Sequence, residues 1–293
     1  MPASGAAKQD PYLPPRFAPT ATLVPVQENV LAALGWAVAS STLHRIRRGE
    51  GALLAINLSL IAAHGAVFTV RGVMEAFVSV LAILVMYAFN DLYDAPVDWN
   101  NPKKDRALIR TWIEHRQAGV LVTIVLKLVT LAIAYAALGP TPAAAVAAVM
   151  VVNVVYSTML KGVPVADVVA VWVWGSLYAA IVAPTFAVTF LVGLMTGVCH
   201  LFQALDDRAP DAENGIQTTA VRSAVLSRNV LVALSLLLVG ILWSSIGVVA
   251  AATGVVPLVI FFLVADAGVG WLLTKAYFAV VWLWFLGSSG AAG

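Results

Sequence analysis

The sequence predicts an all-α protein with about nine transmembrane helices. Hydrophobic residues make up 61% of the 293 positions and charged residues only 11%, and the mean hydropathy is +0.92. A soluble domain carries about 25% charged residues. A disordered chain needs low hydrophobicity and a high net charge, whereas the formal net charge here is +2. The one cysteine, Cys199, excludes an internal disulfide and a thiolate zinc cluster.

The chain divides into an N-terminal segment, residues 1–50, and a membrane domain, residues 51–293. Six prolines interrupt the first 27 residues, which lack the apolar run of a signal peptide and therefore indicate a Pro-rich tail. Between positions 28 and 43 apolar side chains recur at helical spacing, and a basic cluster follows. We expect an amphipathic helix on the membrane surface there.

Apolar runs after Glu50 define the expected spans. A helix needs about 20 apolar residues to cross a bilayer. Pro96 and Pro210 follow the second and sixth runs and predict a bend or a restart of the helix at each proline. The nine runs are 52–71, 74–90, 118–138, 141–160, 164–184, 186–204, 228–248, 251–266 and 269–287.

The basic residues predict the orientation. They concentrate in the N-terminal segment and in the connections after the second, fourth and sixth spans, whereas the other connections hold little besides Arg71. The positive-inside rule then places the N-terminus and the long connections in the cytoplasm. We expect an integral protein of a bacterial cytoplasmic (inner) membrane, with the aromatic run 271–284 anchored at an interface.

Acidic residues gather in two clusters directly after the second and sixth spans. The first contains Asp91, Asp94 and Asp98, and the second contains Asp207 and Asp211. Spacings of three, four and seven residues let each set face one way on a helix. Carboxylates held together need a cation among them, and oxygen ligands without thiolates suit Mg²⁺. Two such clusters on one membrane face could hold a diphosphate, although ordinary hydrophilic loops are the alternative.

A third polar patch, with Tyr156, Lys161 and Asp167, lies on the face predicted for both acidic clusters. Lys161 and Asp167 could simply pair with each other, but their position favours a shared site. Cations would stabilise the charge that develops on a leaving diphosphate. The basic candidates for that role are Lys103, Lys104, Arg106, Lys161 and Arg208.

Three motifs resemble those of one family. Asn90-Asp91-x-x-Asp94-x-x-x-Asp98 is similar to the first aspartate motif of the UbiA superfamily of intramembrane prenyltransferases. Asp207-Arg208-Ala209-Pro210-Asp211, with the stretch 215–220, resembles the second motif. Tyr156, Lys161 and Asp167 resemble the element between them. The resemblance covers about residues 50–288 and implies nine helices bundled around a central cavity.

The resemblance also implies a mechanism. The first cluster would bind one Mg²⁺ and the second cluster another, and both ions would hold the diphosphate of a polyprenyl donor. Asn90 would orient the first cluster. Departure of diphosphate would leave an allylic cation, which an aromatic or other electron-rich, lipid-soluble acceptor attacks. The residues that would neutralise the phosphate oxygens are Lys161, Lys104, Arg106 and Arg208.

Polar and aromatic side chains in the spans are further candidates. His200 and Gln203 lie seven and four residues before Asp207, so they can share its helix face and bind the acceptor, although a helix-to-helix hydrogen bond is the alternative. Aromatic faces attract cations. The aromatic candidates for the pocket wall are Tyr156, Tyr93, Trp172, Trp174, Tyr178 and Phe202.

Two departures leave the subfamily open. Arg106 is followed by Ala107, where many members have proline, and 101–104 look closer to the branch that transfers phosphoribose to decaprenyl phosphate. The second motif looks closer to 4-hydroxybenzoate polyprenyltransferases. Phosphoribosyl transfer and intramembrane terpene cyclisation therefore stay as alternatives to prenyl transfer. An ion-coupled transporter is the alternative outside the enzymes, but its acids would be expected at the midplane.

Overall fold

The computed structural model describes residues 29–47, 50–99, 101 and 104–288. The predicted Pro-rich tail and Lys103 lie outside these residues. The described part is all-helical and contains no strand. Its elements are α1 (Val30–Arg47), α2 (Ala52–Ala63), α3 (Val70–Asp98), α4 (Arg106–Glu114), α5 (Arg116–Leu138), α6 (Pro140–Val155), the π-helical turn η1 (Tyr156–Leu160), α7 (Ala166–Ala179), α8 (Phe186–Asp206), α9 (Arg208–Glu213), α10 (Thr219–Arg222), α11 (Ala224–Ser245), α12 (Val248–Thr253), α13 (Val256–Leu263) and α14 (Ala267–Gly287).

Six helices are long and apolar enough to cross a membrane: α3, α5, α6 with η1, α8, α11 and α14. Shorter apolar helices occupy the other three predicted runs, at α2, α7 and the pair α12 and α13. The apolar segments therefore lie where the sequence predicts them, but the count of about nine spans is not confirmed. The 12 residues of α2 cover about 18 Å, less than the ~30 Å of a hydrocarbon core.

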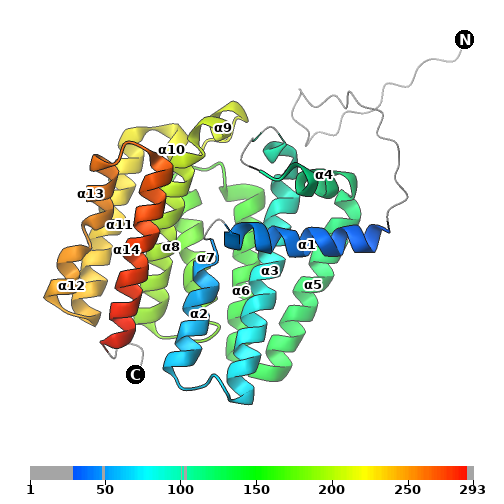
Figure 1. Ribbon diagram of the computed structural model, residues 1–293, viewed down its shortest axis with the longest axis horizontal. Coiled ribbons are helices and arrows are strands. Elements are labelled where there is room, and N and C mark those ends of the chain that lie inside the picture. The colour runs from blue at the N-terminus through cyan, green and yellow to red at the C-terminus, as the bar shows by residue number, and fades with distance from the viewer. Residues whose placement is uncertain (1–28, 48–49, 100, 102–103, 289–293) are drawn as a thin grey trace, which may run out of the picture.

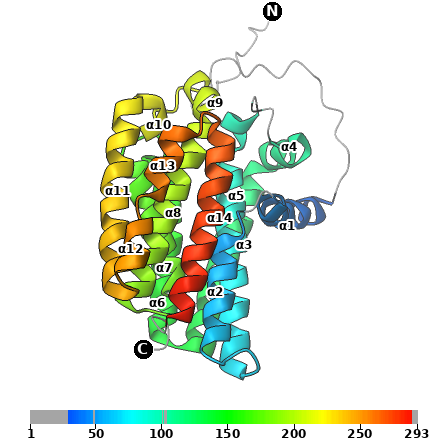
Figure 2. The same cartoon turned by 60° about the vertical axis from the view of Figure 1, so that its left-hand side comes forward.

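The long helices run side by side. Helices α9 and α10 lie at one end of the bundle, and the C-terminal end of α14 lies at the other (Figure 1). Helix α1 lies across the long helices (Figure 1) and packs on α3 and α4, next to which Figure 2 shows it. Its buried residue Leu34 shares a small core with Leu92 and Trp112, and the Trp112 indole donates to the Ser41 hydroxyl at 3.3 Å. Helix α1 is thus fixed to the membrane domain, while its place at a membrane surface stays a prediction.

Close packing of α7 against α8 sets the wall of the bundle interior. A Cβ on Gly193 would lie 2.1 Å from the Ser176 Oγ, and one on Gly175 would lie 2.3 Å from the Thr196 Oγ1. Glycines let two helix backbones approach closely in a membrane. This approach holds the polar end of α8 beside the start of α7.

The prolines do not act where the sequence predicts. Helix α3 continues through Pro96 to Asp98, so the expected restart is wrong at the first motif, while the alternative of a bend stays a prediction. Pro96 has no N–H to donate to the Leu92 carbonyl, but it lies in the last turn of α3, so the helix loses this one bond close to its end. At the second motif the break falls at Asp207, between α8 and α9, and Pro210 lies within the first turn of α9.

Candidate active site

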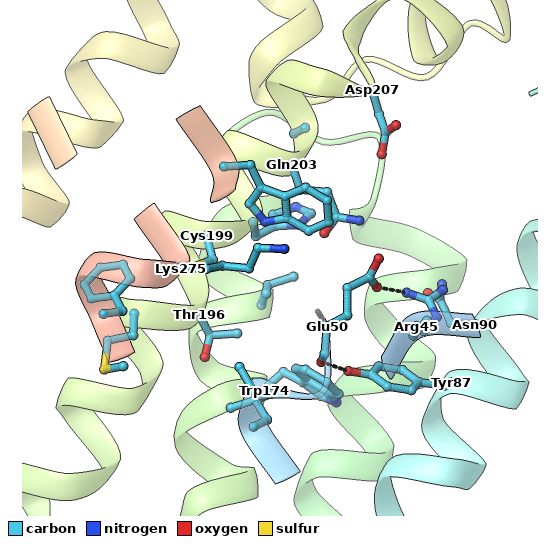
Figure 3. A pocket seen from close by; sticks show the side chains of 18 of the residues that line it. Arg45, Glu50, Tyr87, Asn90, Trp174, Thr196, Cys199, Gln203, Asp207 and Lys275 are labelled. Atoms are coloured by element: carbon cyan, nitrogen blue, oxygen red, sulfur yellow. Dashed lines mark hydrogen bonds and ion pairs between the residues drawn. The ribbon is translucent and has the colours of Figure 1, made fainter. Parts of the chain in front are cut away.

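One cavity of about 570 Å³ gathers most of the predicted site residues. It is lined by residues of α1, α2, α3, α6, η1, α7, α8, α9 and α14, so that segments far apart in the chain meet in it (Figure 3). The predicted residues that line it are Asn90, Asp94, Asp98, Lys104, Tyr156, Lys161, His200, Gln203, Asp207 and Asp211. Both acidic clusters therefore face a common space.

The first acidic motif occupies the last turns of α3. Asp94 and Asp98 line the main cavity, whereas Asp91 lines a small neighbouring recess that Asp98 also reaches. The Asn90 amide donates to the Asp94 Oδ2 at 2.9 Å, and its carbonyl accepts from the Ser157 hydroxyl at 3.3 Å. Asn90 therefore links α3 to η1 and orients Asp94.

Each carboxylate of this motif contacts a different cation. Lys161 Nζ lies 2.6 Å from the Asp94 Oδ2, and Lys104 Nζ lies 3.1 Å from the Asp98 Oδ2. Asp91 pairs with Arg45 of α1. The three negative charges are thus compensated by cations from three different parts of the chain.

Arg45 joins α1 to the site. Its guanidinium also pairs with Glu50 at 3.0 Å and lies 4.8 Å from the ring centroid of Tyr87, whose hydroxyl donates to the Glu50 carbonyl at 2.8 Å (Figure 3). The sequence places Arg45 only in a basic cluster at the membrane surface. Its role in the site depends on α1 crossing over α3, which no local pattern encodes.

The π-helical turn η1 carries Tyr156 into the cavity and leads directly to Lys161. The Lys161 amide donates to the Tyr156 carbonyl at 2.9 Å, the five-residue bond of a π-helix. Burial alone would lower the pKa of Lys161, but the Asp94 charge outweighs it and holds that pKa above its usual range. Lys161 is therefore a fixed positive charge.

The second motif begins at Asp207, between α8 and α9, and Asp211 lies in the first turn of α9. Both line the cavity. Burial raises the pKa of Asp211 to about 6; Lys161 lowers it, and Asp207, Asp94 and Asp98 raise it. The negative charges of the first motif thus raise the pKa of a carboxylate of the second, so the two motifs are close enough to interact electrostatically.

Besides Asp91, three predicted site residues do not line the cavity. Asp167 is fully buried at the start of α7, where it accepts from the Thr219 amide at 2.8 Å and from the Thr219 hydroxyl. It therefore ties α7 to α10 rather than pairing with Lys161. Arg106 lies 5.5 Å from the ring centroid of Trp99, and Arg208 is exposed at the start of α9.

The aromatic candidates divide between the cavity and the packing of the bundle. Tyr156 and Trp174 line the cavity. Tyr178 is fully buried, and its hydroxyl donates to the Ser79 carbonyl at 2.8 Å. The candidates that pack on other rings are Trp172 on Phe190, Tyr93 on Phe89 and Phe202 on Phe261.

Helix α14 adds cavity residues that the sequence analysis did not assign to the site. Trp271, Lys275 and Trp282 line the cavity, and Trp271 and Trp282 are only 8% and 5% exposed. The expected anchoring of the run 271–284 at a membrane interface is thus wrong for Trp271 and Trp282, because both side chains are buried. The sequence held one signal that α14 contributes to the site, namely Lys275 within an otherwise apolar run.

The donor set fits Mg²⁺, because four carboxylates from two motifs line one cavity and hard oxygen ligands are those Mg²⁺ prefers. In the described residues no three acidic, histidine or cysteine side chains converge into a preformed metal cluster. Asp94 and Asp98 are instead held by lysines. Each of these contacts uses one carboxylate oxygen, so a metal would bind either the second oxygen or the oxygen that the lysine now contacts.

Comparisons with known proteins agree with this geometry. A stretch of 145 residues, 46% of the chain, is 34% identical to lycopene elongase/hydratase of Haloarcula japonica, and the chain spans 48% of that relative's length. The fold matches a structure of digeranylgeranylglyceryl phosphate synthase with a TM-score of 0.65 and 11% identity, covering 89% of this chain and 99% of the other.

Two further structures share the fold. A UbiA homologue from Archaeoglobus fulgidus bound to DMAPP and Mg²⁺ matches with a TM-score of 0.55 and 17% identity over 87% of this chain and 99% of the other. The same homologue bound to GPP and Mg²⁺ gives 0.56 and 17% over 80% and 97%. The sequence model of the UbiA prenyltransferase family matches residues 52–286. The chain therefore belongs to the UbiA prenyltransferase family, and its six long apolar helices indicate an integral membrane protein.

Proposed function

We propose that this protein is a Mg²⁺-dependent enzyme that ionises a polyprenyl diphosphate and transfers the prenyl group to an aromatic or other electron-rich acceptor, releasing diphosphate. The observation that carries the proposal is the single cavity. Most of its acidic and basic residues, from α3 and the segments around η1 and α9, lie at one end, and the residues of α2 and α14 that line the rest are apolar apart from Ser59 and Lys275. A polyprenyl diphosphate has the same division between a charged head and an apolar tail.

At the charged end, Asp94 and Asp98 would hold one Mg²⁺ and Asp207 and Asp211 a second, with Asp91 supporting the first. The ions supply Lewis acidity to the leaving diphosphate. Lys161 and Lys104, released from their carboxylates, would bind phosphate oxygens, and Asn90 would keep Asp94 oriented. Arg106 and Arg208 are outer cations that could attract the anionic donor to this face.

At the apolar end, the cavity follows α2 and α14. Leu53 and Ile56 of α2 and Phe278 of α14 line it, and so does Leu283, which is 67% exposed. The cavity therefore reaches the outside of the bundle between these helices. An isoprenoid tail placed there would bury apolar surface at about 25 cal/mol per Å² and could enter from the lipid.

The transfer itself needs a site where a carbocation survives. The C–O bond of the donor breaks, diphosphate leaves with the electron pair, and the acceptor supplies the electrons of the new bond and then loses a proton. The rings of Tyr156 and Trp174 line the cavity and could stabilise the cation by their π faces. His200, whose ring lies edge-on to Tyr156 at 5.8 Å, and Gln203 would contact the acceptor.

The relatives support a prenyl diphosphate donor, because two structures with this fold hold DMAPP or GPP together with Mg²⁺. The lycopene elongase/hydratase similarity supports an electron-rich, lipid-soluble acceptor. Basic residues near the acidic motifs support an active site on the cytoplasmic side of the membrane.

The test uses the purified full-length protein in lipid nanodiscs with a panel of prenyl diphosphates of five to fifty carbons and lipid extract as the acceptor. We expect diphosphate release and a prenylated product by mass spectrometry, only with Mg²⁺. Asp207→Asn should abolish both. Asp266→Asn is the matched control, because Asp266 caps α14 outside the cavity and asparagine caps as well.

Two outcomes would contradict the proposal. Release of diphosphate from phosphoribosyl diphosphate in the presence of a polyprenyl phosphate, with none from any prenyl diphosphate, would assign the phosphoribosyl transfer reaction. A hydrocarbon product formed without any acceptor would assign cyclisation.

A further inference from the structure

Helix α1 has two opposite faces, and only one of them packs on the protein. Its 18 residues cover about 27 Å, yet it is not among the six helices apolar enough to cross a membrane. The inner face lies against α3 and α4 and repeats every three or four residues: Leu34, Val38, Ser41 and Arg45. The outer face has the same spacing and is exposed: Ala32, Trp36, Ala39, Leu43 and Ile46. The outer face is therefore apolar, and no described part of the chain covers it.

The packing of α1 sets its depth along the bundle. Its inner face shares a small core with Leu92 of α3 and Val122 of α5. Val122 lies six residues after Arg116, the first residue of α5, and so about 9 Å from the basic end of this spanning helix. Leu121, next to Val122, is 63% exposed and would meet lipid. The outer face of α1 thus lies at a level where α5 meets lipid, and interfacial helices bury their apolar face about 5–10 Å into the headgroup boundary.

Basic residues lie at the C-terminal end of α1. His44, Arg45 and Arg47 are in its last turn, and no acidic residue is in its first turn. Arg47 is exposed beside Ile46, whereas Arg45 points inward to Asp91. Positive charges next to an apolar face are attracted to the phosphates of anionic lipids. The apolar face, the basic end and the depth together favour a lipid surface over a second protein chain as the occupant.

We propose that the outer face of α1 binds the headgroup boundary of the bilayer and that this contact holds Arg45 at the charged end of the cavity. Arg45 lies on the inner face, where it pairs with Asp91 and contacts Glu50 at 3.0 Å. It also lines the main cavity. Release of α1 would withdraw this cation from Asp91 and raise the negative charge that an incoming diphosphate meets. This second step rests on the proposed function, whereas the lipid contact does not.

The lipid contact is tested without any activity. Cys199→Ala removes the one native thiol, and Ala39→Cys then carries the fluorophore NBD on the full-length protein in nanodiscs. The matched control is Arg110→Cys with the same label, because Arg110 is exposed on α4 and pairs there with Glu114. We expect lipids brominated near the headgroup to quench the label at position 39, and aqueous iodide to quench only the label at position 110.

The link to the site is tested by calorimetric binding of inorganic diphosphate with Mg²⁺. Trp36→Ser with Leu43→Ser should weaken this binding by about tenfold, the scale of one hydrogen bond to a charged group. Arg45→Met should weaken it as much, and the three changes together no further, because they act through one charge. Arg45→Lys should restore part of the affinity, because it keeps the charge. Leu236→Ser with Trp243→Ser is the matched control, since this pair has the same spacing on the exposed side of α11, which does not line the cavity.

Three results would overturn the proposal. A label at position 39 that iodide quenches and lipid does not would place the outer face in water. A label shielded from both quenchers would assign the outer face to a protein contact. Unchanged diphosphate affinity in the Trp36→Ser, Leu43→Ser protein, with its label at position 39 no longer quenched by lipid, would break the link to Arg45.

The two measurements fail separately. Ala39 is exposed, so its label leaves the packed residues of α1 in place, and the lipid contact is decided even where a serine variant does not fold. If the wild-type protein binds no diphosphate with Mg²⁺, the proposed function fails, whereas a broken link to Arg45 leaves wild-type binding intact.

Discussion

Replacing Asp167 by asparagine tests whether this residue binds substrate or holds the fold. The family resemblance implies a role in the site, whereas the structure places the carboxylate between α7 and α10, where Thr219 donates both its amide and its hydroxyl to it. Residue Val165, just before α7, has a φ of 70° and donates its amide to the Thr219 hydroxyl at 2.7 Å. A positive φ is strained for a β-branched residue. Asp167 and Thr219 together hold this strained entry to α7.

The magnitude follows from the two bonds. Hydrogen bonds to a charged group contribute about 1.5–3 kcal/mol each. Asparagine keeps one acceptor oxygen and turns an amide donor toward the other Thr219 donor, so about one bond is lost. The free energy of unfolding should fall by about 2 kcal/mol, which lowers the melting temperature by roughly 4–8 °C for a chain of this size.

The assay is thermal unfolding of the detergent-solubilised protein, together with the KM for the prenyl diphosphate. A double-mutant cycle with Thr219→Val supplies the control, because the second substitution should cost less once the first has been made. An unchanged melting temperature with a tenfold higher donor KM would refute the reasoning and assign Asp167 to the substrate.

Three other perturbations test the site and the bundle. Lys161→Met should lower kcat by about 10²–10³, since it removes a cation 2.6 Å from Asp94 that would stabilise the leaving group. Steady-state product formation measures kcat, and a decrease of less than tenfold would argue against that role. Gly193→Ala should destabilise the fold by about 1–3 kcal/mol, because its Cβ would lie 2.1 Å from the Ser176 Oγ. Gly240→Ala is the control, because its Cβ would meet nothing within 4 Å and the change should be neutral or stabilising. Equal melting temperatures of the two variants would contradict the close packing of α7 on α8. Chelation by EDTA should abolish transfer reversibly yet shift the melting temperature little, since lysines already compensate the acidic motif; irreversible loss or unfolding would show a structural metal instead.

Sequence reasoning located the acidic motifs because their spacing is local. The positions of Asp94 and Asp98 on one helix face, and of Asp211 four residues after Asp207, follow from helical periodicity alone. It could not identify the partners of Asp167 and Lys161, because these depend on which helices meet. Asp94, 67 residues before Lys161, is the partner of that lysine, and Thr219, 52 residues after Asp167, is the partner of that aspartate.

Element lengths show the same limit. Apolar runs predicted nine segments at the right places, yet α2, with 12 residues, and α7, with 14, end earlier than their runs because the chain turns before the apolar residues are exhausted. The tryptophans of α14 also read as interface anchors from composition. Trp282 is instead buried and donates to the Ser59 hydroxyl of α2 at 2.8 Å, a contact that joins the first and the last apolar helices.

The sequence by itself determined that this is a helical membrane protein with two acidic motifs. Hydropathy and short-range spacing are properties of neighbouring residues, so they can be read along the chain. Only the tertiary structure decided which charges meet. It placed Arg45 of α1 on the first motif and Lys275 of α14 in the same cavity as both motifs. The physical reason is that an ion pair or a cavity forms between helices. Its members are therefore chosen by packing across more than 200 residues of chain and not by the order in which they occur.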